Sequence, residues 1–150
     1  MQKITTFFMF DSGAGNAMDF YAAVFKNGKI ISTIPGPDGK PMGGTFELDG
    51  QRFIAFNGGP QFKFSSGISL FVNAENQDEI DHYYEKLSDG GEKQPCGWLK
   101  DKFGVSWQVV PTRFNELFNS ADPEVAGRVG QALFRMKKII IADLEAAAAG

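Results

Sequence analysis

An internal repeat is the feature that most restricts how this chain can fold. Moving the first half along by 62 positions places Tyr21 on Tyr83, and it also aligns the apolar strand positions and the glycines that end the helices. Towards the ends of the two halves the shift falls to 54, which places Gly50 on Gly104. Because strands, helices and turns align in the same order, the repeat indicates duplication of one supersecondary unit rather than a chance agreement between two amphipathic helices.

Each copy has the pattern of a strand, a helix and three short strands. In the first copy, apolar spacing typical of a helix runs from residue 17 to residue 25 and ends at Asn27-Gly28. Asp49-Gly50 is a strong signal for a two-residue hairpin turn. The expected strands include 3–10, 29–34, 44–48, 52–56 and 67–72, and the second helix is expected at 77–87. The second copy has a shorter middle at 94–100.

We therefore predict an α+β fold of two β-α-β-β-β modules, whose curved mixed sheets surround a central cavity, followed by C-terminal helices. The chain of 150 residues is expected to be a single domain, with module one at about 3–60, module two at about 66–111 and a helical tail at 112–150. A small molecule is the expected occupant of the cavity.

Strand alternation predicts which side chains face that cavity. The expected inward residues are Thr6, Phe8, Phe10, Ile54, Phe56, Ile68, Leu70, Val72, Ser106, Gln108 and Val110. Phe7, Met9, Phe53 and Trp107 are expected on the helix sides. The expected ligand-binding set is Thr6, Phe8, Phe10, Phe56, Leu70, Cys96, Trp98 and Gln108. This wall is apolar apart from one amide, and the Gln108 amide is expected either to pair with backbone groups or to orient a ligand.

The tail has helix signals of its own. Residues 113–118 have the pattern of a short helix, and Asp122-Pro123-Glu124 supplies an N-cap and a first-turn proline. One apolar stripe follows at Val125, Val129, Ala132, Leu133 and Met136. Two interpretations stay open: this stripe and Ile139-Ile140-Ile141 pack against the sheets, or they form a dimer contact.

Composition argues against several classes of partner. The net charge is -3 and no basic stripe with interleaved aromatic residues is present, so nucleic-acid binding is not expected. No apolar run approaches the roughly 20 residues that span a bilayer, so a membrane partner is not expected either. A single cysteine excludes an intrachain disulfide and fits a reducing compartment. We expect a cytoplasmic protein.

Three segments resemble a known family. They are Phe56-Asn57-Gly58-Gly59-Pro60, the stretch from Cys96-Gly97-Trp98 to Val109-Val110-Pro111, and the stretch from Met136 to Ala146. Together they resemble the PhnB-like family of the vicinal oxygen chelate superfamily, which includes glyoxalase I, bleomycin-resistance proteins and extradiol dioxygenases. The family also carries the label 3-demethylubiquinone-9 3-methyltransferase. The resemblance implies the paired fold and a homodimer, and it implies little about chemistry. One departure is Ile140, where such sequences often have an Asp that opens the last helix.

The resemblance also implies where a metal ion would bind. Metal-using members of the superfamily take ligands from the first and last strands of each module, and these positions map to Thr6, Ile54, Ile68 and Gln108. A divalent metal needs three or four His or carboxylate ligands, whereas this set offers an amide and a hydroxyl. The only histidine, His82, falls in the middle of a predicted helix. We therefore expect no metal site and no cofactor.

Two other chemistries have partial signals. The loop from Phe10 to Gly15 is similar to the Asp-x-Gly-x-Gly loop of S-adenosylmethionine-binding proteins, but three strands follow without an intervening helix, which favours a simple connector. Cys96 lies near Lys93 and Lys100, which would favour a thiolate, but no histidine is placed to act as its base. We assign no catalytic residue.

Three functions remain open at this point. The leading hypothesis is a metal-independent protein that binds an apolar or aromatic small molecule. The alternative is an enzyme, either a methyltransferase as the family label suggests or one with a lyase-like activity. The third is a dimeric interaction module whose cavity is filled by its own phenylalanines.

Overall fold

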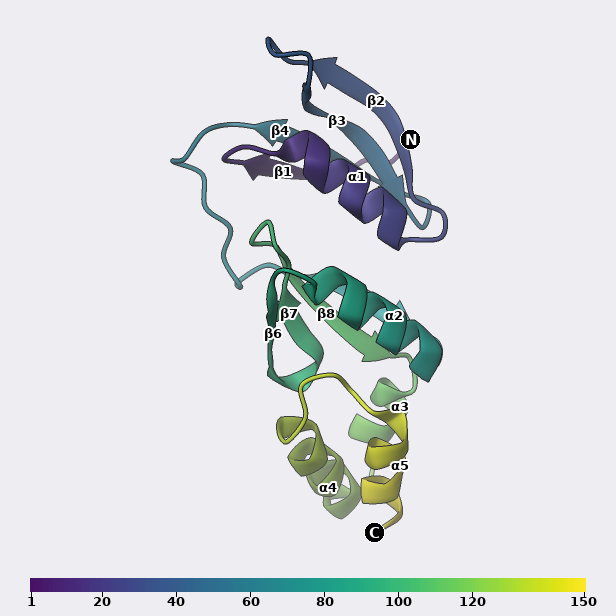
Figure 1. Ribbon diagram of the computed structural model, residues 1–150. Coiled ribbons are helices and arrows are strands. Elements are labelled where there is room, and N and C mark those ends of the chain that lie inside the picture. Colours follow the sequence, from purple (N-terminus) through teal and green to yellow (C-terminus); the bar gives the residue numbers. More distant parts are fainter. The chain divides into compact units, whose positions relative to one another are not determined.

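The computed structural model describes the whole chain, Met1–Gly150, which divides into two units at Met1–Phe64 and Ser65–Gly150 (Figure 1). Each unit contains one four-stranded mixed sheet with one helix against it. The α+β class and the duplicated β-α-β-β-β unit predicted from the repeat are therefore confirmed.

The first unit begins with a strand and a helix and continues with a three-stranded meander. Its elements are β1 (Thr6–Phe10), α1 (Ala14–Val24), β2 (Lys29–Pro35), β3 (Pro41–Leu48) and β4 (Gln51–Asn57). The strand order is β1-β4-β3-β2, in which β1 runs parallel to β4 and the other neighbours are antiparallel. Asp49 and Gly50 turn the chain between β3 and β4 with φ values of 49° and 81°, the left-handed conformation that a tight hairpin turn requires.

Aromatic side chains fill the core of the first unit. The ring of Phe8 stacks on Phe46 and Phe53, with centroid separations of 6.4 and 5.9 Å. Tyr21 of α1 stacks on Phe46 at 5.9 Å, and Phe64 adds an edge contact to Phe8 at 6.2 Å. Each buried aromatic ring removes a large apolar area from water, so this cluster accounts for much of the hydrophobic stabilisation of the unit.

The second unit repeats this arrangement with shorter strands. Its elements are β5 (Leu70–Ala74), α2 (Gln77–Ser88), β6 (Glu92–Lys93), a short 3-10 turn η1 (Pro95–Gly97), β7 (Trp98–Lys100) and β8 (Ser106–Pro111). The strand order is β5-β8-β7-β6, with β5 parallel to β8. Asn76 caps α2 by accepting the Glu79 N–H at 2.9 Å.

A buried carboxylate organises the turn between β7 and β8. Asp101 is 2% exposed, and its Oδ1 accepts the backbone N–H groups of Phe103 and Val105 at 2.9 and 3.0 Å. Its Oδ2 accepts the indole N–H of Trp107 at 2.8 Å. Hydrogen bonds to a charged group are the stronger kind, so this carboxylate fixes both the turn and the Trp107 ring.

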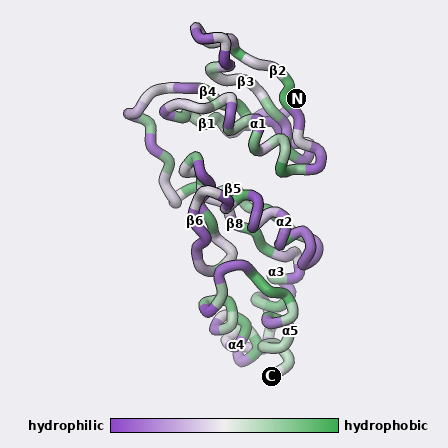
Figure 2. The backbone as a smooth tube through the Cα atoms, in the orientation of Figure 1, coloured by the Kyte–Doolittle hydropathy of each residue, from purple (hydrophilic) through white to green (hydrophobic).

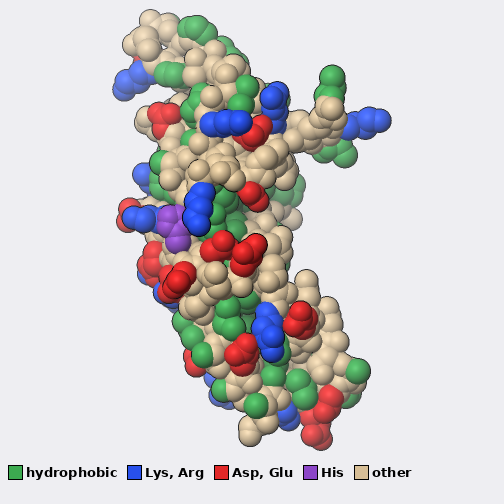
Figure 3. Space-filling view, turned by 90° about the vertical axis from the view of Figure 1, so that its right-hand side faces the viewer, with side chains coloured by type: hydrophobic (Ala, Val, Ile, Leu, Met, Phe, Trp, Pro, Cys, Tyr) green, Lys and Arg blue, Asp and Glu red, His purple; other side chains and the backbone are tan.

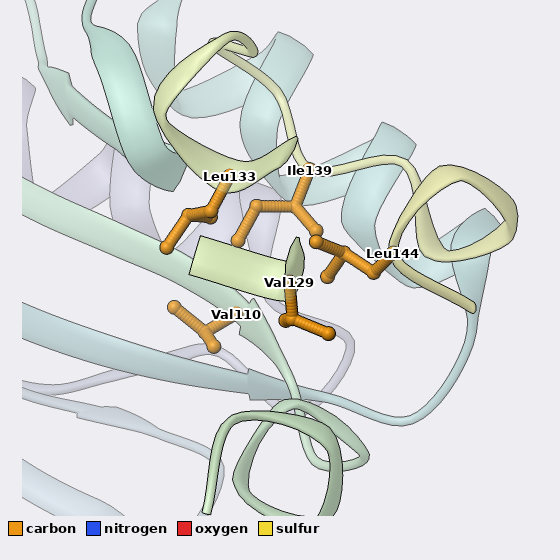
Figure 4. Packing of buried hydrophobic residues seen from close by; sticks show 5 residues of the cluster. All are labelled: Val110, Val129, Leu133, Ile139 and Leu144. Atoms are coloured by element: carbon orange, nitrogen blue, oxygen red, sulfur yellow. The ribbon is translucent and has the colours of Figure 1, made fainter. Parts of the chain in front are cut away.

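Three helices form the tail: α3 (Phe114–Phe118), α4 (Pro123–Phe134) and α5 (Ile141–Ala149). Figure 4 shows the side chains that join α4, α5 and the segment before α5 to β8 in one apolar cluster, made of Val110, Val129, Leu133, Ile139 and Leu144. Asp122 caps α4 as predicted, accepting the Glu124 N–H at 3.0 Å. The stripe on α4 and Ile139 therefore pack within the second unit, which is the first of the two interpretations left open by the sequence.

The last helix begins without an acidic cap of its own. Ile140 stands at the N-cap position of α5 and makes no side-chain cap bond. Instead, Gln77 at the start of α2 accepts the Ile141 N–H at 2.8 Å and donates to the Ile139 carbonyl at 3.0 Å. A residue distant in sequence thus takes the capping role, because the side-chain amide offers both an acceptor and a donor.

No helix in the structure has the length and apolar character needed to cross a bilayer. Figure 2 shows hydrophobic stretches interrupted by hydrophilic ones along the whole backbone. Positive and negative side chains are mixed over the face shown in Figure 3, without a stripe of one sign.

Candidate functional site

In each unit the helix covers one face of the sheet, and we call the opposite side the open face. In the first sheet, neighbouring strands place Phe7 beside Ile54 and Ile54 beside Thr45 on the open face. The next row along the strands is Met9, Phe56 and Gly43. In the second sheet, Phe71, Gln108 and Trp98 form the corresponding row.

The predicted orientation of the first strand is wrong. Phe8 and Phe10 are 6% and 2% exposed in the core beneath α1, where Phe8 lies 6.4 Å from Tyr21 between ring centroids. Phe7, expected beneath the helix, is 52% exposed. The parallel register pairs Thr6 with Phe53, so Thr6 and Phe8 share the helix-side face of Phe53. The run Phe7-Phe8-Met9-Phe10 has no polar residue to mark its solvent side, and a shift of one residue exchanges the faces.

The same correction applies to the second sheet. Leu70 pairs with Trp107 and Val72 with Val109, and both partners are at most 2% exposed on the side that α2 covers. Phe71, between them, is 49% exposed on the open face. Ile68 precedes β5 and is 79% exposed, so it lines no part of the sheet. Val110 shares the face of Gln108, but the tail cluster buries it.

Three members of the expected ligand-binding set lie on the open faces: Phe56, Trp98 and Gln108. The fourth remaining member, Cys96, is partly buried against the tail cluster. Its backbone is left-handed, with φ 65° and ψ 31°, and its N–H donates to the Met136 carbonyl at 3.0 Å. The next residue, Gly97, donates to the Lys137 carbonyl at 2.8 Å. The backbone of Cys96 therefore attaches the tail.

The open face of the second sheet carries fixed polar groups between aromatic rings. Gln108 donates from Nε2 to the Ser69 hydroxyl at 2.9 Å, so the amide pairs with a side chain rather than with the backbone. Ser106, two residues earlier on the same face, is 2% exposed and its hydroxyl has no hydrogen-bond partner. Sequence reasoning expected Ser106 on this face but gave it no role. A hollow of about 460 Å³ borders Trp98.

The position of Trp98 is set from α2. The hydroxyl of Tyr84 lies within hydrogen-bond distance of two carbonyls, those of Gln94 at 2.9 Å and Trp98 at 3.0 Å, and its single proton is shared between the backbone on the two sides of η1. Burial raises the pKa of Tyr84 to about 12, so this hydroxyl remains a donor at neutral pH. A rigid backbone at Trp98 means that its ring is presented to the open face by the packed core of the unit.

The glycine-containing loop of the first unit is a connector. Gly13 adopts φ 81° just before α1, and the Ala14 N–H donates to the Asn57 side chain at 2.8 Å. At Gly15 a Cβ atom would lie 3.1 Å from the Pro41 carbonyl, so the glycine allows α1 to approach β3 closely. The strands that follow, β2 to β4, are antiparallel, which differs from the alternating parallel sheet of S-adenosylmethionine-binding Rossmann folds.

Comparison with known proteins places this fold and these motifs in one family. The family described as 3-demethylubiquinone-9 3-methyltransferase matches residues 2–110. The chain belongs to this PhnB-like family. A PhnB protein from Bacillus cereus with the same methyltransferase label is 35% identical, with a TM-score of 0.66 over 74% of this chain and 100% of the other.

More distant structures share the vicinal oxygen chelate fold alone. Protein PA1353 from Pseudomonas aeruginosa is 18% identical, with a TM-score of 0.59 over 74% of this chain and 98% of the other. The fosfomycin resistance protein FosX from Listeria monocytogenes, solved with Mn(II) and sulfate, is 16% identical, with a TM-score of 0.51 over 73% of this chain and 91% of the other. None of the curated proteins matches the chain significantly.

Membership in the PhnB-like family gives its motifs a structural meaning here. In Phe56-Asn57-Gly58-Gly59-Pro60, the Gly58 N–H extends the β1–β4 ladder by donating to the Phe10 carbonyl at 2.7 Å. A Cβ atom on Gly58 would lie 2.4 Å from the Met9 sulfur, so any other residue there would displace the Met9 side chain. The family match ends at residue 110, and α3, α4 and α5 lie beyond it.

FosX was solved with Mn(II), whereas the side chains of this chain do not fit a divalent metal ion. No group of three or more His, Cys, Asp or Glu residues is placed to hold a metal ion. Of the four positions implied by the resemblance, Thr6 shares the helix-side face of Phe53 and Ile68 lies outside the sheet. The ring of His82 contacts Tyr83 on α2, 5.0 Å away.

Charged residues on α2 hold the tail rather than a ligand. Lys138 contacts Asp81 and Glu85 at 3.1 and 3.4 Å. Hydrogen bonds from Gln77 and then from Lys138 lower the pKa of Asp81, whereas Lys93 and then Lys138 lower the pKa of Glu85. The hydrogen bond to Asp81 raises the pKa of Lys138. These groups are all charged at neutral pH and join the segment before α5 to α2.

Proposed function

We propose that the protein binds an apolar or aromatic small molecule on the open face of its second sheet, without a metal ion. The observation that carries this proposal is the Gln108 amide, fixed by Ser69 between Phe71 and Trp98 and close in sequence to the unpartnered Ser106 hydroxyl. Binding sites for small molecules are apolar walls with a few fixed polar groups, which is the composition of this face.

The open face of the second sheet offers a ligand both a polar contact and an aromatic one. The Ser106 hydroxyl is enclosed by protein, so the groups available to a ligand on this face are the Gln108 amide and the exposed aromatic rings. Phe71 is half-exposed, and an aromatic ring stacked against it would gain about 0.5–1.5 kcal/mol beyond the area buried. The Oε1 atom of Gln108 has no protein donor and offers an acceptor for an N–H or O–H group of the ligand.

Metal independence is part of the proposal. The open face of the second sheet offers an amide and two hydroxyls, from Gln108, Ser69 and Ser106, which are weak ligands for a divalent ion. Ligand affinity should therefore be the same in chelator as in buffer that contains Zn²⁺, Mn²⁺ or Mg²⁺. A dependence on any of these ions would contradict this part of the proposal.

Binding is tested with a library of neutral aromatic amides and phenols, read by thermal shift and by tryptophan fluorescence. Trp98 is the partly exposed indole and Trp107 the buried one, so quenching reports on the open face. We expect Trp98→Ala and Gln108→Leu each to weaken a hit about tenfold, or about 1.4 kcal/mol. Phe134→Ala, which removes an exposed ring from α4, is the matched control. No shift or quenching with any compound at millimolar concentration would overturn the proposal.

The family label motivates one further titration. Calorimetry with S-adenosylmethionine tests the enzyme alternative directly, because a methyltransferase must bind its methyl donor. We expect no heat of binding at millimolar concentration. If S-adenosylmethionine gave a saturable heat of binding that persisted in Trp98→Ala, methyl transfer would be the better assignment.

We also propose that the protein is a cytoplasmic homodimer. The single cysteine and the family resemblance support this proposal. A further support is β2, an edge strand whose Ile30, Ile31 and Ile34 are 36–40% exposed, because a free apolar edge favours pairing with another strand. Sedimentation of the wild type and of Ile34→Lys tests the dimer: a monomeric wild type would contradict it.

A further inference from the structure

A second hollow lies on the first unit, at the charged end of its open face. It measures about 630 Å³ and is lined by Gln2, Thr5, Thr45, Arg52 and Ile54 among others. Arg52 and Glu47 are neighbours across β4 and β3, and Glu47 is the neighbour of Lys29 on β2. All of these residues belong to the unit Met1–Phe64, so the hollow is independent of the site on the second sheet.

The backbone of Arg52 is held by a side chain that acts as a strand partner. The Gln2 amide accepts the Arg52 N–H through Oε1 at 3.0 Å and donates from Nε2 to the Arg52 carbonyl at 3.0 Å. Nε2 also donates to the Ile4 carbonyl at 2.9 Å. These bonds satisfy the backbone of β4 where β1 has not yet begun, and they fix the start of the Arg52 side chain.

The Arg52 side chain contacts one carboxylate, which it shares with a second cation. Its Nε atom lies 3.5 Å from Glu47, and Glu47 also receives Lys29 at 3.3 Å. The Glu47 side chain is only 17% exposed. This largely buried carboxylate lies between Lys29 and Arg52, so the three side chains together carry a net positive charge. The guanidinium of Arg52 also carries the terminal Nη1 and Nη2 atoms. They form the planar fork that pairs with two oxygens of one anion.

Apolar side chains continue this face away from the charge. Along β4, Ile54 is two residues from Arg52 and Phe56 is four, which corresponds to about 7 and 13 Å in an extended strand. Phe7 lies beside Ile54 and is half-exposed. At Gly43 a Cβ atom would lie 3.1 Å from the Phe56 ring, so the absence of a side chain there leaves room for that ring on the sheet.

We propose that this hollow binds an aromatic carboxylate, with the carboxylate on the Arg52 guanidinium and the ring on Ile54 and Phe7. The separation of about 7 Å between successive side chains on one face matches a ring one or two bonds from its carboxylate, as in benzoate or phenylacetate. The site differs in ligand class from the neutral hydrogen-bonding face of the second sheet. It requires a negative charge on the ligand.

The test compares phenylacetate with phenylacetamide, which has the same shape without the charge, by calorimetry and by ¹H NMR of the ligand. We expect phenylacetate to bind at least about tenfold more tightly at low salt, with the preference falling as ionic strength rises. Equal affinity of the acid and the amide would overturn the proposal. Binding of inorganic phosphate as tight as that of phenylacetate would also overturn it, because the apolar rows would then contribute nothing.

Variants locate the effect. Arg52→Gln should abolish the preference for the acid, and Arg52→Lys should keep only part of it because the fork is lost. Arg135→Gln removes a cation after α4 and should leave the preference unchanged. Phe7→Ala should weaken both ligands to the same extent. An unchanged preference for the acid in Arg52→Gln would refute the assignment. In Trp98→Ala the preference for the acid should persist, because Trp98 belongs to the site on the second sheet.

Discussion

Replacing Asp101 by Ala should destabilise the second unit more than any other polar substitution on β7 or β8. The substitution removes three hydrogen bonds to one carboxylate and leaves three donors behind. The Phe103 N–H is partly buried and can turn to water, but the Val105 N–H and the Trp107 indole are buried. Two orphaned buried donors at about 1–3 kcal/mol each give a loss of about 2–6 kcal/mol.

Asp101→Asn should cost less than Asp101→Ala. The amide oxygen can still accept the two backbone N–H groups, but the amide NH₂ group then faces the Trp107 indole, which is also a donor. We expect about 1–3 kcal/mol, the cost of one unsatisfied buried group. Comparison of the two variants therefore separates the contribution of the hydrogen bonds in the turn from that of the hydrogen bond to the Trp107 indole.

Urea unfolding followed by tryptophan fluorescence measures these losses. Both tryptophans, Trp98 and Trp107, lie in the second unit, so the signal reports its unfolding specifically. An unchanged m-value would show that the loss reflects native stability. Asp89→Asn at the exposed end of α2 is the control and should change stability by less than about 0.5 kcal/mol. An Asp101→Ala loss within that same range would refute the reasoning.

Three further predictions concern the tail and its contacts. Gln77→Ala should cost about 0.5–2 kcal/mol, the value of a helix cap, and should speed amide exchange in α5 because the Ile141 N–H loses its acceptor. Attachment of the tail should weaken at both extremes of pH. The contribution of Asp81, whose pKa lies below its ordinary value of 3.8, is present above that value and lost as the pH falls through the lower folded-state pKa. The contribution of Lys138, whose pKa lies above 10.5, is lost as the pH rises through that higher folded-state pKa. Protease protection of α5 that stayed constant from below pH 3.8 to above pH 10.5 would contradict the contact. Gly97→Ala should loosen the tail strongly because φ is +82° and a Cβ atom would lie 2.8 Å from Ile139, and a wild-type melting temperature in that variant would show the contact to be unimportant.

The sequence predicted the architecture because the repeat is a property of local patterns. Helix stops, the Asp49-Gly50 turn and the Asp122 cap each depend on a few adjacent residues, and all three occur as expected. Strand orientation depends instead on which side of the sheet the helix covers. The run from Phe7 to Phe10 is apolar on both faces, so the sequence alone does not indicate which of these residues face the helix. The register with the parallel strand β4 determines it. Phe53 was correctly assigned to the helix side. Its pairing with Thr6 places Thr6 and Phe8 on that side too.

The site residues that sequence reasoning missed are those defined by long-range contacts. Phe71 was missed for the same reason as Phe7, because the residues of its strand were assigned to the wrong faces of the sheet. The role of Asp101 was invisible because an Asp between two lysines has the pattern of a solvated surface, and only the fold buries it. Arg52 gave no signal at all, since its alignment depends on Gln2, fifty residues earlier.

In the proposed function, a ligand engages the Gln108 amide on the open face of the second sheet. The most direct measurement is the side-chain NH₂ resonance of Gln108 in ¹H–¹⁵N spectra, assigned by its loss in Gln108→Leu, during titration with an aromatic amide that gives a thermal shift. We expect a saturable change in that resonance with the same Kd as the quenching of Trp98. A ligand that stabilises the protein while the Gln108 resonance stays unmoved would contradict it.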